Sequence, residues 1–228
     1  HNSLLCDDDG RIFLFYHTRF NNAGEMHEMR VHQVFINEDG WPVTAPFEYT
    51  GETLSKDISQ SDVVGSYEVL FHELNIDYDN REVKEGKTYV FGADGSVKGS
   101  KNGTWKFSKE KGAPYVDVTF GDTVYKGVFV EQQLEGSYDT ALTFTLLGSD
   151  EISAWGYKKA MSNSQLLQAA IDDISIPEVI TGDKVELPTT GLYNSVITWT
   201  SSETGVITVD GNVLTRGSSP IALTLTAK

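Results

Sequence analysis

Residues 1–17, HNSLLCDDDGRIFLFYH, decide the fold, because they contain two short apolar runs separated by an acidic turn. The run 1–6 predicts a first strand. The run 11–17 predicts a second strand that is apolar on both faces. Asp7-Asp8-Asp9-Gly10 is typical of a tight turn, since Gly and Asp accept positive φ. The chain is therefore predicted to open with a β-hairpin.

Two further strands extend this hairpin. Residues 27–36 predict a third strand, Asn37-Glu38-Asp39-Gly40 predicts a turn, and residues 41–45 begin a short fourth strand. Pro42 removes a ladder donor, so the fourth strand is expected at an edge. Four antiparallel strands in residues 1–52 are typical of one blade of a β-propeller.

A single blade cannot bury its own apolar side chains. By itself the sheet would leave four large side chains uncovered, namely Phe13, Phe15, Val31 and Phe35. Hydrophobic burial is worth about 25 cal/mol per Å2, but it requires neighbouring blades. The remaining sequence does not repeat the blade pattern, and the chain opens in strand-like sequence at His1 without an initiator Met. We therefore expect the other blades to come from another segment of a longer protein.

Residues 53–159 predict a closed or nearly closed antiparallel β-barrel. Alternation is clear in Val116/Val118/Phe120 and in Leu142/Phe144/Leu146. The predicted strands are 65–71, 87–91, 103–108, 115–120, 123–130, 140–147 and 151–158.

Residues 160–228 predict a small Ig-like sandwich led by a short helix. Ser162-Asn163-Ser164 can cap a helix over 165–171. Short strands are predicted at 184–187, 195–200, 206–209, 212–215 and 221–227. The whole chain is therefore expected to be all-β.

The composition excludes several classes of partner. The net charge is −15, with 33 acidic and 18 basic residues, so the surface repels nucleic acid and anionic lipid. No stretch approaches the ~20 apolar residues of a membrane helix, so we expect no membrane insertion. Cys6, the single cysteine, is interpreted as a buried small hydrophobic residue in a strand.

Four motifs in order carry a family resemblance: HNS at 1–3, FYHTRF at 15–20, HEMRVHQ at 27–33 and NEDGWPV at 37–43. This series closely resembles the last blade of the endo-1,5-α-L-arabinanases of glycoside hydrolase family 43. Residues 53–159 look like the C-terminal barrel of the larger bacterial arabinanases. The helix followed by ITWTSS and VITVDGNVLTR resembles the atypical bacterial Ig-like modules of secreted polysaccharidases.

The resemblance implies a five-bladed propeller that hydrolyses α-1,5-linked arabinofuranose chains with inversion. Inversion uses an acid and a base separated by about 6.5–9.5 Å, which leaves room for a water. The family's three catalytic carboxylates lie on earlier blades and match no position here, so we expect no catalytic residue in this chain.

His1 matches a different feature of the family. The resemblance implies that the His1 imidazole points into the central channel and binds one metal ion, expected to be calcium, with waters completing the shell. Calcium prefers oxygen ligands, so waters would carry most of the coordination. A copper site built on His1 is the alternative, but its second histidine would have to come from His17, His27, His32 or His72, which lie in strands of another architecture.

Three other groups have a functional and a structural interpretation. Glu25, His27, Glu28 and His32 could form a metal cluster, but Arg30 between Glu28 and His32 favours a charge-paired row on one strand face. The acidic pairs and runs, Asp7-Asp8-Asp9, Asp150-Glu151 and Asp172-Asp173, are interpreted as solvated rather than calcium-binding. The aromatic residues Trp41, Trp105, Trp155 and Tyr115 could stack on sugar rings, but core or interdomain packing is preferred, with Trp41 at the base of the blade.

Two functions remain open. In the first, the chain completes the propeller of a secreted bacterial arabinanase, and its partners are the missing N-terminal blades and arabinan. In the second, it is a non-catalytic carbohydrate-binding or cell-surface module, because residues 53–228 contain no catalytic constellation. Both place the protein outside the cell or at its surface.

Overall fold

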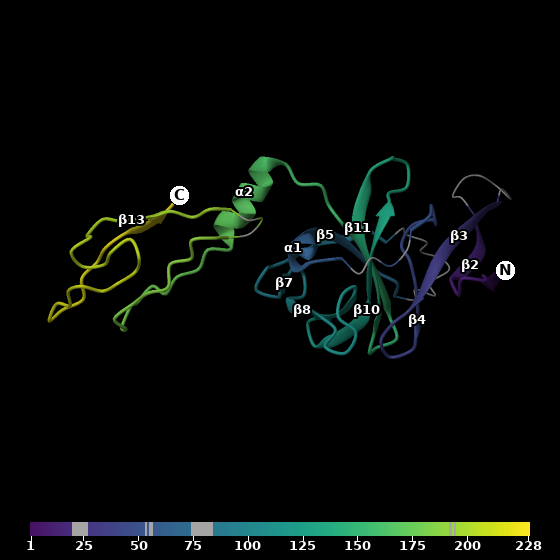
Figure 1. The fold of residues 1–228 in the computed structure, drawn as a ribbon, viewed down its shortest axis with the longest axis horizontal. Helices are drawn as coiled ribbons and strands as arrows, with labels where there is room; N and C mark the ends of the chain where they lie inside the picture. Colours follow the sequence, from purple (N-terminus) through teal and green to yellow (C-terminus); the bar gives the residue numbers. More distant parts are fainter. Residues whose placement is uncertain (20–26, 53, 55–56, 74–83, 192, 194) are drawn as a thin grey trace. The chain divides into compact units, whose positions relative to one another are not determined.

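The structure, a computed structural model, describes all of the chain except residues 20–26, 53, 55–56, 74–83, 192 and 194 (Figure 1). It divides into two compact units, His1–Ala160 and Met161–Lys228. The first unit is built mainly from antiparallel strands, and the second contains one helix, a two-stranded antiparallel sheet and isolated bridges, so the all-β prediction is confirmed. Within the described residues, no helix has the length and apolar character needed to cross a membrane.

A four-stranded antiparallel sheet begins the first unit. Its strands follow one another in chain order, and their bounds are β1 Asn2–Cys6, β2 Ile12–Arg19, β3 His27–Ile36 and β4 Pro42–Thr44. The predicted turns join these strands, and β4 lies at an edge as Pro42 requires. The sheet predicted from the opening residues is confirmed.

The burial of this sheet differs between its two ends. Of the four side chains that the sheet by itself would leave uncovered, Phe13 and Phe35 are buried within the whole chain, and Phe15 and Val31 are partly buried. At the β1 edge Leu4 and Leu5 are 64% and 50% exposed, and Met29, near the beginning of the interior strand β3, is 70% exposed. The rest of the chain therefore covers only part of the apolar surface of the sheet.

An eight-stranded closed antiparallel barrel follows. A short helix, α1 Gln60–Val63, precedes it, and Val63 is buried. The strands are β5 Gly65–Phe71, β6 Lys87–Phe91, β7 Ser96–Lys98, β8 Gly103–Phe107, β9 Tyr115–Phe120, β10 Thr123–Gln133, β11 Thr140–Gly148 and β12 Ser153–Lys158. The sequence predicted seven of them and missed β7, because three residues are too short to show a period.

Aromatic side chains fill the interior of the barrel. The rings of Tyr67 and Phe91 lie 4.7 Å apart, and Phe144 packs against both. Val116, Val118 and Phe120 of β9 are all buried, as the alternation predicted. Such edge-to-face and tilted ring pairs stabilise the core beyond the area that they bury.

The sheet and the barrel share one apolar cluster. Phe35, Val43 and Ala45 of the sheet segment pack with Val128 and Val130 of β10. Figure 1 shows β4 beside the barrel strands β10 and β11. Burial on both sides of this junction explains why Phe35 is only 5% exposed.

The second unit begins with the helix α2, Asn163–Asp172. Ser162 is its N-cap and forms a capping box with Gln165, so the predicted helix is confirmed. The predicted strands are largely replaced by shorter pairings: only β13 Trp199–Ser201 and β14 Leu225–Ala227 are strands among the described residues of this unit. Isolated bridges join Lys184 to Asn212, Thr190 to Val196 and Ile207 to Val213. The alternation was present, but the segments pair over single residues rather than continuous ladders.

Candidate functional site

His1 lies at the beginning of β1, where three histidine rings follow one another across the sheet. The His1 ring centroid is 5.9 Å from that of His17 on β2. The His17 centroid is in turn 4.9 Å from that of His27 on β3. All three residues are exposed. The antiparallel register places them at the same end of three neighbouring strands.

These residues do not make a calcium site by themselves. Among the described residues, no group of three or more His, Cys, Asp or Glu side chains is arranged to hold a metal ion. Calcium needs six to eight oxygen ligands, whereas the groups beside His1 are imidazoles. A metal at His1 would need oxygen ligands from water or from another segment, so the role of His1 remains a prediction.

Two other histidines have structural roles. His32 is buried, its Nε2 lies 3.1 Å from the Tyr16 hydroxyl, and its Nδ1 lies 2.8 Å from the Ala45 carbonyl oxygen. His72 packs edge-on against Trp155 with centroids 4.2 Å apart, and burial lowers the pKa of its imidazole. These contacts tie both rings to the junction between the sheet and the barrel.

Arg30 forms the charge-paired row that was predicted on β3. Its guanidinium lies 3.0 Å from Glu28, 2.9 Å from Glu48 and 2.6 Å from Glu135. The hydrogen bond to Glu135 is the main reason that the pKa of Arg30 is raised. Glu25 lies outside the described residues.

The acidic turn at residues 7–10 is structural, as predicted. Asp7 accepts hydrogen bonds from the backbone N–H of Asp9 and Arg11, and its carboxylate pairs with the Arg11 side chain at 2.7 Å. Cys6 beside it is exposed, so the prediction of a buried thiol was wrong. The edge position of β1 explains this exposure, because no strand lies beyond it within the described chain.

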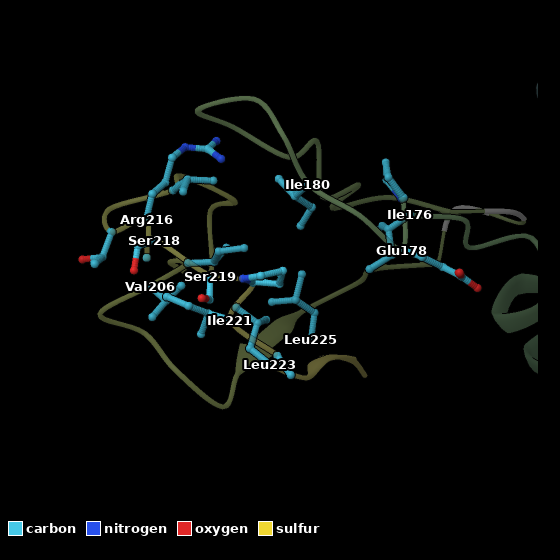
Figure 2. Close-up of a pocket in the computed structure, with 17 residues that line it drawn as sticks. Ile176, Glu178, Ile180, Val206, Arg216, Ser218, Ser219, Ile221, Leu223 and Leu225 are labelled. Carbon is cyan, nitrogen blue, oxygen red and sulfur yellow. The ribbon is translucent and has the colours of Figure 1, made fainter.

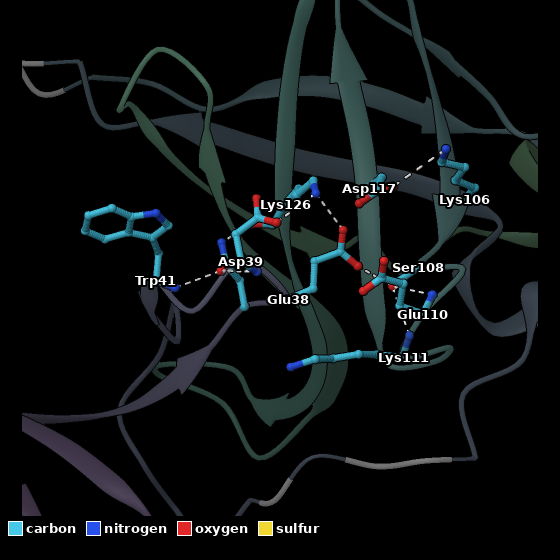
Figure 3. Close-up of polar contacts among 10 residues, drawn as sticks. Glu38, Asp39, Trp41, Lys106, Ser108, Glu110, Lys111, Asp117 and Lys126 are labelled. Carbon is cyan, nitrogen blue, oxygen red and sulfur yellow. Dashed lines mark hydrogen bonds and ion pairs between the residues drawn. The ribbon is translucent and has the colours of Figure 1, made fainter.

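Sequence reasoning missed a polar cluster at the junction (Figure 3). Glu38, in the β3–β4 turn, accepts a hydrogen bond from Lys126 of β10 at 2.6 Å and another from Ser108. Lys126 also donates to Asp39 at 2.9 Å, and Asp117 of β9 lies in the same group. The residues that form this cluster are up to 88 positions apart, so no local pattern could reveal it.

The cluster shifts the pKa values of two carboxyl groups, Glu38 and Asp117, in opposite directions. The hydrogen bond from Lys126 holds the pKa of Glu38 below its usual value. Burial, followed by the neighbouring Glu38 charge, raises the pKa of Asp117. The side chains of Glu38 and Asp117 are only 14% and 19% exposed. Glu38 therefore stabilises the junction through Lys126, whereas burial disfavours the ionised form of Asp117, and both covered acids are poorly placed to reach a polymer.

The four aromatic candidates fall into two groups. Trp105 is buried and donates its indole N–H to the Gly92 carbonyl, and Trp155 stacks over His32 between the sheet and the barrel. Tyr115 packs against the junction cluster. Packing was therefore the correct interpretation for these three residues. Trp41 is 62% exposed, so the prediction that it packs at the base of the blade was wrong.

Trp41 lies at an open cleft between the β3–β4 turn and the barrel. The cleft has a volume of 610 Å3, within the range of small-ligand sites. Polar groups and an apolar floor both contribute to its lining, which consists of Asn37, Asp39, Trp41, Val124, Lys126, Leu147, Gly148, Ser149 and Glu151.

A second cavity, of 740 Å3, lies in the second unit (Figure 2). Ile180, Ile221 and Leu225 are among its mostly apolar lining, and the charged ends of Glu178 and Arg216 lie on opposite sides of this apolar cluster. One carboxylate and one guanidinium do not provide the acid–base pair that glycoside hydrolysis requires.

Two family models match the chain. Residues 46–156 match a C-terminal lipocalin-like domain of glycoside hydrolase family 43, which includes the barrel from β5 to β11 and most of β12. Residues 166–228 match the atrophied bacterial Ig domain.

The chain is also similar to longer proteins with known names. It is 38% identical over 159 residues to extracellular endo-α-(1→5)-L-arabinanase 2 of Bacillus subtilis, a match that covers 69% of this chain and 32% of that protein. It is 37% identical over 163 residues to an extracellular endo-α-(1→5)-L-arabinanase of Thermotoga petrophila, covering 69% and 33%. The chain thus spans about a third of the length of these relatives.

Several solved structures are similar to this chain. A glycoside hydrolase family 43 protein from Bacillus licheniformis matches with a TM-score of 0.64 at 36% identity, over 70% of this chain and 35% of that one. The endo-1,5-α-L-arabinanase of Thermotoga petrophila in complex with Tris matches with a TM-score of 0.63 at 35% identity, over the same shares. The aligned regions correspond to the C-terminal part of the relatives.

Proposed function

Because this chain carries the C-terminal lipocalin-like domain of glycoside hydrolase family 43 and an atrophied bacterial Ig domain, we propose that it is the C-terminal portion of a secreted arabinan-degrading enzyme. The whole enzyme would cleave α-1,5-linked arabinofuranose chains with inversion. This portion would complete the propeller, while the catalytic carboxylates would lie on blades outside this chain.

The open edge of the first sheet is the observation that carries this proposal. Successive residues of a strand point to opposite faces, and Leu4 and Leu5 of β1 are both half-exposed or more. Both faces of the sheet are therefore uncovered at this edge, while the barrel covers the sheet near Phe35 and Val43. A propeller blade needs a neighbouring blade on each face, and this is the surface that two neighbours would cover.

The relatives support the substrate and the location. Two of them are named extracellular endo-α-(1→5)-L-arabinanases, and each is about three times as long as the region matched here. The net charge of −15 is compatible with a neutral polysaccharide such as arabinan. The missing N-terminal blades and arabinan are the proposed partners.

Complementation tests this proposal. The chain would be mixed with a polypeptide that carries the missing blades, and release of reducing sugar from debranched arabinan would be measured. Each part alone should be inactive and the mixture active. Hydrolysis by this chain alone would contradict the proposal, because it would place catalytic groups within residues 1–228.

A matched pair of variants identifies the surface that assembles. Leu5→Asp places a charge on the open edge and should abolish the activity of the mixture. Tyr138→Asp changes a side chain that is 96% exposed on the barrel and should leave that activity unchanged. Equal effects of the two changes would show that assembly does not use the β1 edge.

The proposal also assigns a metal-binding role to His1. Its other ligands would be water or groups outside this chain. His1→Ala should lower the activity of the mixture and the affinity of the assembled protein for calcium in a titration. Calcium affinity that is unchanged in this variant would remove His1 from the metal site.

A further inference from the structure

We infer that the cleft around Trp41 is a saccharide-binding site, and that it holds a neutral polysaccharide chain against the junction of the sheet and the barrel. This inference rests on the proposed function, because it adds a second contact with the same class of substrate. No acid–base pair is needed at such a site. Its task is to hold the polymer.

Trp41 supplies the stacking surface. Its neighbour Asn37 fixes the backbone, since the Asn37 side-chain oxygen accepts the Trp41 N–H at 2.9 Å and the Asn37 N–H donates to the Trp41 carbonyl at 2.8 Å. Trp41 nevertheless remains 62% exposed, and its indole extends away from the Glu38–Lys126 cluster (Figure 3). An exposed aromatic face on a fixed stretch of backbone suits the apolar C–H face of a sugar ring.

The rest of the cleft suits sugar hydroxyl groups. Asp39 and Glu151 offer carboxylate acceptors, and the ammonium group of Lys126 is a donor. Val124 and Leu147 provide an apolar floor from β10 and β11. A few polar groups around an aromatic and apolar surface are typical of small-ligand sites.

Glu151 occupies a position in its turn where glycine is usual. The turn from Gly148 closes with hydrogen bonds from Gly148 N–H to Ile152 O and from Glu151 N–H to Gly148 O. The β3–β4 turn has the same pattern, with Gly40 at φ 88° in the equivalent place. Glu151 adopts φ 65°, a conformation that is unfavourable for a side-chain-bearing residue. A side chain in this unfavourable conformation points to a use for it, and Glu151 lines the Trp41 cleft.

A neutral chain is the occupant that the charges favour. The cleft carries two carboxylates for one lysine, and that lysine is already paired with Glu38 and Asp39. The whole chain has a net charge of −15, so a polyanion such as polygalacturonate would be repelled. Linear arabinan is the neutral polymer to which the relatives' names point.

Binding of the full chain to polysaccharide tests the inference. Affinity electrophoresis in gels with debranched arabinan or polygalacturonate would be combined with calorimetric titration by arabinohexaose. The chain should be retarded by arabinan and not by polygalacturonate. Trp41→Ala should weaken binding about tenfold. Tyr138→Ala, which removes an exposed aromatic residue outside the cleft, should bind as the original chain does.

Glu151→Gly provides a second, independent variant. It removes the carboxylate and relieves the unfavourable φ, so it should melt no lower than the original chain and should bind arabinohexaose more weakly. The inference is overturned if the original chain is not retarded by arabinan, if Trp41→Ala binds unchanged, or if Tyr138→Ala weakens binding equally.

The assembled protein separates this inference from the proposed function. Retardation that disappears when the missing blades are added would show that those blades cover Trp41, which would overturn the inference and leave the enzyme proposal intact. An active mixture whose C-terminal chain never binds arabinan by itself would also overturn the inference and leave the enzyme proposal intact. Binding at Trp41 without activity in the mixture would instead contradict the proposed function.

Discussion

Replacing Lys126 by Met tests the claim that the polar cluster holds the sheet to the barrel. Met replaces the apolar stem of the lysine but removes the ammonium group that contacts Glu38 at 2.6 Å and Asp39 at 2.9 Å. Removal leaves two carboxylates without their cation, and the Glu38 side chain is only 14% exposed. The variant should therefore lower the free energy of unfolding of the first unit.

The size of this loss follows from burial. Breaking a fully buried ion pair costs about 3–5 kcal/mol, but Lys126 is 28% exposed, so we expect about 1.5 kcal/mol for the contact with Glu38. The Asp39 carboxylate is 51% exposed and adds about 0.5 kcal/mol. Together these contacts predict a loss of about 2 kcal/mol, or about 4–8 °C in Tm for a unit of this size.

Urea and thermal unfolding of the full chain would measure this loss. Lys106→Met is the matched control: Lys106 pairs with Asp117 at 3.7 Å and is 62% exposed, so its loss should be below about 0.5 kcal/mol. A double-mutant cycle with Glu38→Gln should give a coupling energy of about 1 kcal/mol. Equal losses in the two lysine variants, or zero coupling, would refute the reasoning.

Three further predictions use other parts of the chain. Burial and then the Glu38 charge raise the pKa of Asp117, so its ionised form destabilises the fold. Asp117→Asn should therefore raise the urea midpoint at pH 7. This gain should fade as the pH falls through the raised pKa of Asp117 into the usual range of aspartate, because the original carboxyl group then becomes neutral. Phe35→Ala should lower the free energy of unfolding by about 3–5 kcal/mol, because Phe35 is buried against Val128, and a loss under 1 kcal/mol in urea unfolding would show that the junction does not depend on it. Ser162→Ala should destabilise α2 by about 1 kcal/mol, seen as faster amide exchange in its first turn, and unchanged exchange would show that the cap is unimportant.

Local patterns were sufficient to locate most elements of the first unit. Gly65–Phe71, Lys87–Phe91 and Tyr115–Phe120 are strands with the bounds that alternation and turn residues predicted. The helix α2 was also visible, because the hydrogen bonds of a capping box lie within four residues of each other. In the second unit the same reasoning predicted too many strands, since alternation reports an extended segment but does not report how long its partner stays paired.

Less of the candidate site could be predicted from the sequence. The motif at residues 1–3 suggested a metal role for His1, but the ring series from His1 to His17 and His27 depends on the pairing of three strands. The exposure of Trp41 was predicted wrongly, because a tryptophan beside a turn has the same local sequence whether it is covered or open. Its environment is set by β10 and β11, which lie more than 80 positions further along the chain.

The sequence by itself determined where most strands and turns of the first unit lie, and that the opening sheet requires covering surfaces, because backbone periodicity and apolar content are local properties. Only the tertiary structure decided which side chains meet. It brought Lys126 to Glu38, placed Phe35 against the barrel, and left Trp41 and the β1 edge open. The physical reason is that burial and charge pairing depend on segments far apart in the chain, whose approach is settled by closure of the barrel and its packing against the sheet.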